Sequence, residues 1–193
     1  MKRKAIRCVI FDLDGTLFDA PYDWVKIKQT LGVPDGEGIL SYIEKLPDKT
    51  KEKKMHMLNA IEEEATRKGK LKEGVKELLR ELKRRGIKRV LLTNNLLRNV
   101  RYITRKCGID FDMVITREMG MTKPGNAAIL YILKEFNLNE SEVIFVGDSI
   151  YDIEPANLSK ISMILVGEIK LKGNFMCVKN IAHLSKLLLN GGD

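Results

Sequence analysis

The stretch "VIFDLDGTLFD", residues 9–19, decides the fold of this chain. It begins as an apolar run, which gives way to two carboxylates, Asp12 and Asp14, one residue apart. In an extended segment, residues two apart point to the same side, so both acids leave the strand together. A Gly-Thr pair follows, and glycine permits a sharp backbone turn. The pattern predicts a buried strand whose end presents two acids at one place.

The composition fits one domain, or one domain with a small insertion, because the chain has 193 residues. It is 44% hydrophobic and 31% charged, which allows a real core under a polar surface. No apolar run approaches the roughly 20 residues that a membrane helix needs. Residues 1–12 show no signal-peptide pattern. We therefore expect a cytoplasmic protein with no membrane association.

The cysteines and the net charge point to no special chemistry. Cys8, Cys107 and Cys177 are far apart and form no metal-binding or disulfide spacing, which suits reduced thiols. The net charge of +8 is compatible with attraction to polyanions. A solvated surface rich in lysine and arginine is the simpler interpretation.

Five short apolar runs predict strands. They are rich in valine and isoleucine and do not alternate with polar residues, which is typical of strands buried on both faces of a parallel sheet. Amphipathic helical patterns lie between them from residue 71 onward, and we expect Pro124 to open one of these helices. This alternation predicts an α/β fold with a doubly wound, Rossmann-like parallel sheet. The predicted strands are 5–11, 88–93, 113–116, 143–147 and 162–167.

Residues 18–70 break this alternation and contain no convincing strand. Turn-forming residues separate three helical patterns there. Tyr22, Trp24 and Lys26 are candidate ligand contacts of this segment, but for Trp24 the favoured interpretation is an anchor of a small core. We interpret this segment as a small all-helical insertion into an α/β domain. The expected helices are 22–31, 36–46 and 49–68, and the expected domains are 1–17 with 71–193 for the α/β core and 18–70 for the insertion.

Polar side chains follow the ends of three predicted strands. Asp12 and Asp14 follow the first, Thr93 ends the second, and Asp148 follows the fourth. Each alone is an ordinary turn or helix-cap residue. The carboxyl ends of parallel strands, however, share one edge of the sheet, where ligands bind. Clustered acids are costly without a cation, and Mg²⁺ favours oxygen ligands, so the pattern predicts a metal and phosphate site.

Four ordered motifs now point to a family. Together they resemble the motif set of the haloacid dehalogenase (HAD) superfamily, and the match spans most of the α/β core. The insertion resembles the small helical cap placed after the first motif in the subfamily that contains phosphoglycolate phosphatase and β-phosphoglucomutase. The motifs are "DLDGT" at 12–16, "LLTNN" at 91–95, "KP" at 123–124 and "GDSIYD" at 147–152.

The resemblance implies roles for the acids. Asp12 would be the nucleophile that becomes an aspartyl-phosphate, and Asp14 would be the general acid and then the general base. Mg²⁺ would be bound by the Asp12 carboxylate, the Asp14 backbone carbonyl and Asp148. Asp152 would hold a metal-bound water or orient Lys123.

The resemblance also implies a phosphate site. Thr93 would donate its hydroxyl to the phosphoryl oxygens, with the backbone of Asn94 as a second donor. Lys123 would offset the negative charge of the transferring group. Gly15 would let the backbone pass close to the phosphate.

These features predict a Mg²⁺-dependent phosphatase that hydrolyses a small phosphorylated metabolite. A phosphomutase on the same fold, resembling β-phosphoglucomutase, is the first alternative, because a cap could shield the aspartyl-phosphate from water. A basic RNA- or protein-binding protein on this scaffold is the second. No RNA-binding signature occurs in the sequence, so no nucleic-acid partner is expected.

Overall fold

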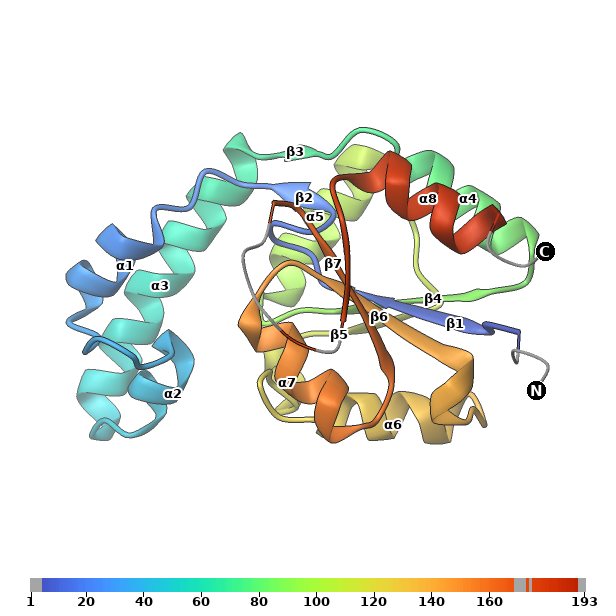
Figure 1. Ribbon diagram of the computed structural model, residues 1–193. Coiled ribbons are helices and arrows are strands. Elements are labelled where there is room, and N and C mark those ends of the chain that lie inside the picture. Colours follow the sequence, from blue (N-terminus) through green and yellow to red (C-terminus); the bar gives the residue numbers. More distant parts are fainter. Residues whose placement is uncertain (1–4, 169–172, 174, 191–193) are drawn as a thin grey trace. The chain divides into compact units, whose positions relative to one another are not determined.

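The computed structural model describes residues 5–168, 173 and 175–190, and the chain divides into two compact units (Figure 1). One unit comprises Met1–Asp19 and Leu71–Asp193, and the other comprises Ala20–Lys70. The first segment of the first unit therefore ends at Asp19, two residues after the expected end at Leu17. No helix within the described ranges is long and apolar enough to span a membrane.

The first unit is built on a parallel sheet, which confirms the predicted fold class. Within the described residues the sheet has six strands in the order β5-β4-β1-β6-β7-β8, and every neighbouring pair is parallel. The chain order reverses between β1 and β6, which makes that position the switch point of a doubly wound sheet. The strands are β1 (Cys8–Phe11), β4 (Lys88–Leu92), β5 (Met113–Ile115), β6 (Val143–Gly147), β7 (Ser162–Val166) and β8 (Met176–Val178).

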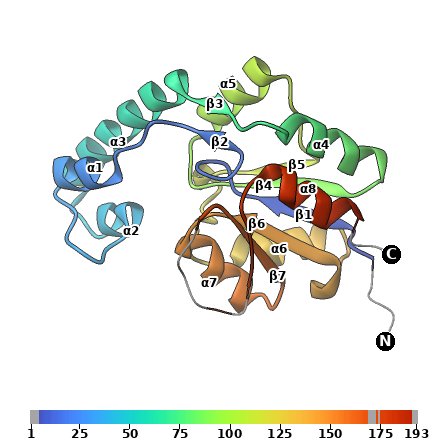
Figure 2. The same cartoon turned by 45° about the horizontal axis from the view of Figure 1, so that its top comes forward.

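Helices cover both faces of this sheet, as Figures 1 and 2 show. On one face lie α4 (Val75–Arg84), α5 (Leu97–Cys107) and α8 (Ile181–Asn190). On the other face lie α6 (Ala127–Glu135) and α7 (Ile150–Leu158). All four residues of β1 are fully buried, because this central strand is covered on both sides. The absence of alternation in the apolar runs is thus explained by two-sided burial.

Three details of this unit differ from expectation. Strand β1 begins at Cys8, three residues later than the predicted run at 5–11. Helix α6 begins at Ala127 rather than at Pro124, because a turn in which the Gly125 amide donates to the Thr122 carbonyl comes first, at 3.1 Å. Strand β8 (Met176–Val178) was not predicted, because it is short and its first two residues are exposed. Two short 3₁₀ helices, Arg117–Met119 and Glu140–Glu142, precede α6 and β6.

The second unit consists of α1 (Trp24–Leu31), α2 (Ile39–Glu44) and α3 (Asp48–Lys68). Its apolar core is formed by Ile27, Leu31, Val33, Ile43 and Leu58. The expectation for Trp24 was wrong, because its side chain is half exposed and stacks on Tyr22, with ring centroids 4.5 Å apart. Residues 18–70 were expected to contain no strand, which is wrong at both ends of the segment: the short strands β2 (Phe18–Asp19) and β3 (Lys70–Leu71), where the chain passes between the units, pair with each other.

Candidate active site

The end of β1 places the first acid at the switch point of the sheet. The Asp12 amide donates to the Val146 carbonyl at 2.9 Å, so the backbone is still paired with β6 at this residue. The chain then turns at once, because the Leu13 carbonyl accepts the amides of Leu17 and Phe18, each at 2.9 Å. Asp12 is buried, whereas Asp14 lies partly buried in the turn.

Two glycines allow the acids of different strands to approach each other. Gly15 has a φ of 82°, and a Cβ there would lie 2.0 Å from Asp148 Oδ2. A Cβ on Gly147 would lie 2.5 Å from Asp152 Cγ. Both contacts are far closer than atoms can come, so a side chain at either position would displace a carboxylate.

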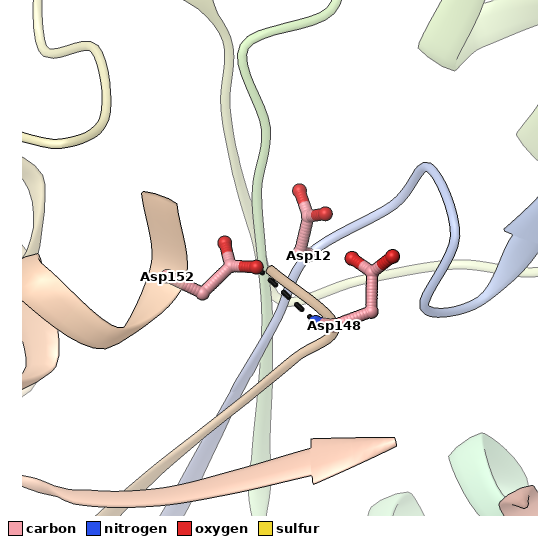
Figure 3. Close-up of side chains that lie close together, drawn as sticks. All are labelled: Asp12, Asp148 and Asp152. Carbon is pink, nitrogen blue, oxygen red and sulfur yellow. Dashed lines mark hydrogen bonds between the residues drawn. The ribbon is translucent and has the colours of Figure 1, made fainter. Parts of the chain in front are cut away.

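Three carboxylates gather at this edge of the sheet. Asp12 follows β1, Asp148 follows β6 and Asp152 lies in α7, and each offers an oxygen within 4.8 Å of the others (Figure 3). The Thr16 hydroxyl donates to Asp148 Oδ1 at 3.2 Å. An all-oxygen cluster of this kind suits a hard divalent cation, because such ions prefer carboxylate ligands. The donor set therefore fits a divalent metal.

Lys123 provides the cation of the cluster. Its Nζ donates to Asp12 Oδ1 and to Asp152 Oδ1, both at 2.6 Å, and its side chain is only 5% exposed. Asp152 Oδ2 accepts the amides of Asp148 and Ser149 at 3.2 and 3.0 Å. Both oxygens of Asp152 are therefore engaged within the protein, and its contacts hold Lys123 in place.

The pKa values at this site report an excess of buried negative charge. Burial, and then the Asp152 and Asp148 charges, raise the pKa of Asp12 well above its usual range, although Lys123 opposes this shift. Burial, and then the Asp152 charge, raise the pKa of Asp148 to about 6. Burial acts to lower the pKa of Lys123, but Asp12 and Asp152 outweigh it and raise that pKa. One ammonium thus faces three carboxylates, and a further cation would relieve the imbalance.

The end of β4 contributes the residues predicted for phosphate binding. Thr93 is buried, and its amide donates to the Ile115 carbonyl at 3.0 Å. The Asn94 side chain holds the backbone of Lys123 at two points: Nδ2 donates to its carbonyl and Oδ1 accepts its amide, both at 2.9 Å. Asn94 therefore fixes the start of the Lys123 side chain, a role that the sequence did not suggest.

Two further residues at the site were missed by sequence reasoning. The Asn95 amide group, from the end of β4, donates to Asp14 Oδ2 at 2.8 Å. Lys72 donates to the Gly15 carbonyl and lies 3.4 Å from Asp19 Oδ1, and its charge opposes in small part the rise in the pKa of Asp148. Asn95 is the last residue of the motif at 91–95, which did not by itself suggest a role for it, and Lys72 resembles any surface lysine.

Comparisons with known proteins agree with this geometry. The family model for haloacid dehalogenase-like hydrolases matches residues 6–159. An uncharacterized hydrolase of Saccharomyces cerevisiae is 31% identical over 78% of this chain and 72% of its own length. An N-acetylmuramic acid 6-phosphate phosphatase of Pseudomonas putida is 25% identical over 77% of each chain.

The solved structures extend the likeness to the fold as a whole. A hydrolase from Pseudomonas syringae superposes with a TM-score of 0.79 at 20% identity, covering 97% of this chain and 100% of that chain. At this level of identity the structural similarity shows the fold alone. Membership of the family is shown by the family model and by the yeast relative. The resemblance drawn from the four motifs is thereby confirmed, and the chain belongs to the haloacid dehalogenase-like hydrolases.

Proposed function

We propose that this protein is a Mg²⁺-dependent phosphatase that hydrolyses a small phosphorylated metabolite through an aspartyl-phosphate on Asp12. One observation carries the proposal. A buried carboxylate at the switch point is held by Lys123 at 2.6 Å and lies beside two further acids. A nucleophile, a cation for the phosphoryl charge and a set of metal ligands therefore occupy one place.

The metal would be held by the carboxylates of Asp12 and Asp148, together with the Asp14 backbone carbonyl. Bound there, Mg²⁺ supplies positive charge to the phosphoryl oxygens. Asp152 would orient Lys123 rather than hold a metal-bound water, because its two oxygens already accept hydrogen bonds within the protein.

The chain's own residues would carry out two successive displacements. An oxygen of Asp12 forms a bond to phosphorus as the bond to the ester oxygen breaks, and Asp14 gives its proton to the departing oxygen. A water then attacks the same phosphorus and gives a proton to Asp14, which releases inorganic phosphate and restores Asp12. The Thr93 hydroxyl and the backbone N–H of Asn94 would donate hydrogen bonds to the phosphoryl oxygens in both displacements.

The helical unit, Ala20–Lys70, would act as the cap that selects the substrate. The half-exposed Trp24, which stacks on the partly buried Tyr22, supports this proposal, because an exposed aromatic ring is suited to contact a ligand. The sugar-phosphate specificity named for the Pseudomonas putida relative makes sugar phosphates the first substrates to try. We propose the cytoplasm as the location.

The experiment is phosphate release from a panel of sugar phosphates, phosphoglycolate, nucleotides and aryl phosphates. The proposal expects turnover with Mg²⁺, none after chelation, and a loss of about a thousandfold or more in Asp12→Asn. Full activity after exhaustive chelation would contradict the metal assignment. An isomerised sugar phosphate without phosphate release would identify a phosphomutase instead.

A further inference from the structure

The side chain of Asn95 links the end of β4 to the acid of the first motif. Its Nδ2 donates to Asp14 Oδ2 at 2.8 Å, across 81 positions of sequence. Asn95 is only 3% exposed, so its amide is removed from bulk water. A buried amide is costly unless its hydrogen bonds are made, which indicates a defined arrangement rather than a chance contact.

The orientation of this amide is fixed from its other side. Asn95 Oδ1 accepts the backbone amide of Leu96 at 2.7 Å and Asn99 Nδ2 at 2.8 Å. A backbone N–H can only donate, so the atom that faces Leu96 must be the amide oxygen. The NH₂ group is therefore the part of Asn95 that faces Asp14.

Asn99 extends this arrangement into α5. It lies one helical turn beyond Asn95, is 2% exposed, and donates to the same oxygen as Leu96 does. The donors of Asn99 and Asn95 point in one direction, from α5 toward Asp14. Hydrogen bonds in such a chain reinforce one another in a buried setting.

We propose that Asn95 is a positioning residue that selects which oxygen of Asp14 carries the transferable proton, and that Asn99 maintains its orientation. A protonated Oδ2 would be a hydroxyl oxygen, which accepts the N–H group of Asn95 more weakly than a carbonyl oxygen does, so the observed hydrogen bond favours an unprotonated Oδ2. The proton is therefore carried by Oδ1, which becomes the oxygen that serves the departing group. This inference rests on the proposed function, in which Asp14 is the general acid.

The test exploits the leaving group. A poor leaving group needs a proton from the general acid, whereas a good one departs as an anion without it. We would measure kcat/KM for phenyl phosphate and for 2,4-dinitrophenyl phosphate with saturating Mg²⁺. This ratio reports the steps up to formation of the aspartyl-phosphate, which include the proton transfer to the leaving oxygen.

Asn95→Leu keeps the approximate side-chain size but removes the donor. We expect kcat/KM for phenyl phosphate to fall at least about tenfold, while that for 2,4-dinitrophenyl phosphate changes less than about threefold. Asn99→Leu leaves Asn95 and Asp14 in place. It should also lower kcat/KM more for phenyl phosphate than for 2,4-dinitrophenyl phosphate, a difference that we call the split, but by a smaller factor than Asn95→Leu does. Asn157→Leu, an exposed asparagine of α7, is the matched control and should show no split.

Equal losses on both substrates in Asn95→Leu would overturn the inference, because they would indicate a structural role alone. An unchanged enzyme would overturn it too. If Asn95→Leu does not fold, the absence of any split in Asn99→Leu would overturn it. Asp14→Asn separates this failure from that of the proposed function: no split in Asp14→Asn contradicts Asp14 as the acid. A wild-type enzyme inactive on both substrates would overturn both proposals.

Discussion

Two buried cations of the α/β unit each lie between two aspartates, at opposite ends of the parallel sheet. Lys123 binds Asp12 and Asp152 at the carboxyl edge. Arg89, near the start of β4, binds Asp110 at 3.2 Å and Asp112 at 3.1 Å at the amino edge. Both cations are almost fully buried, but a third carboxylate, Asp148, lies at the carboxyl edge, whereas a second cation, Lys83, binds Asp110 at the amino edge.

The pKa values of the acids in the two clusters are shifted in opposite directions. Hydrogen bonds from Arg89 and Lys83 lower the pKa of Asp110 to about 2, and its side chain is 64% exposed. Burial acts against ionisation of Asp112, but Arg89 outweighs it and lowers that pKa. At the carboxyl edge the pKa values of Asp12 and Asp148 are raised instead. Ionised acids are therefore favoured at the amino edge, whereas the excess negative charge at the carboxyl edge is what a metal ion would neutralise in the proposed function.

Removal of the cation at the carboxyl edge should have the largest effect on activity. Lys123→Met leaves two buried carboxylates facing each other and takes a positive charge from the phosphoryl group. We expect kcat/KM to fall at least about a hundredfold. Steady-state phosphate release measures this. A loss below tenfold, with the fold intact by circular dichroism, would show that Lys123 serves only the packing of the site.

In the metal-free protein, the free energy of unfolding should depend on pH because the charge of Asp148 is unfavourable in the folded state. The folded pKa of Asp148, about 6, lies above its ordinary value of 3.8, so its charge destabilises the fold above pH 6 and ceases to do so as pH falls toward 4. In chelator at pH 7, Asp148→Asn should therefore raise the free energy of unfolding by up to about 3 kcal/mol. Urea unfolding at pH 4 to 7 tests this, and a gap between variant and wild type that widens toward pH 4 would contradict it.

Removal of the cation at the amino edge should affect stability and spare activity. Arg89→Met should lower the free energy of unfolding by about 1–2 kcal/mol, less than for a fully buried pair because Asp110 is exposed to solvent. Its kcat/KM should stay within about threefold of wild type, since no substrate group lies at that edge in the proposed function. A loss of activity comparable to that of Lys123→Met would remove the distinction between the edges.

The exposed acid at the amino edge should show the smallest effect. Asp110→Asn should lower the free energy of unfolding by no more than about 1 kcal/mol at pH 7, because water and salt screen the pair. The folded pKa of Asp110 lies below its ordinary value, so this contribution is present above pH 4 and is lost as pH falls toward 2. Urea midpoints at low and high salt measure it, and a loss that persists in 1 M salt would argue against a screened pair.

The sequence predicted five of the six strands described in the sheet and missed one edge strand. Strands β4, β5, β6 and β7 lie within one residue of the predicted runs, and β1 begins three residues later than predicted. In the central strands, burial on both faces forces a continuous apolar sequence. The edge strand β8 was missed, because its apolar run at 175–178 is short and two of the strand's three residues are exposed. Trp24 shows the same limit, because its stacking on Tyr22 depends on the packing of the helical unit and not on hydrophobicity alone.

At the site, the sequence predicted the residues that act at strand ends but not those that act through others. Asp12, Lys123 and Asp148 stand in short motifs, and the structure brings them together. Asn95 stands in the motif at 91–95, but its role could not be recognised, because its partner Asp14 lies 81 positions away and only the fold joins them. Lys72 likewise reaches the Gly15 carbonyl only through the fold.

The most direct test of the account is chemical trapping of the phosphorylated residue. Borohydride reduces an acyl phosphate of aspartate to homoserine, so quenching the enzyme during turnover with Mg²⁺ should mark the nucleophile. Peptide mass spectrometry should then find homoserine at position 12, only in the presence of substrate. Homoserine at another aspartate, or at none during measurable turnover, would contradict Asp12 as the nucleophile.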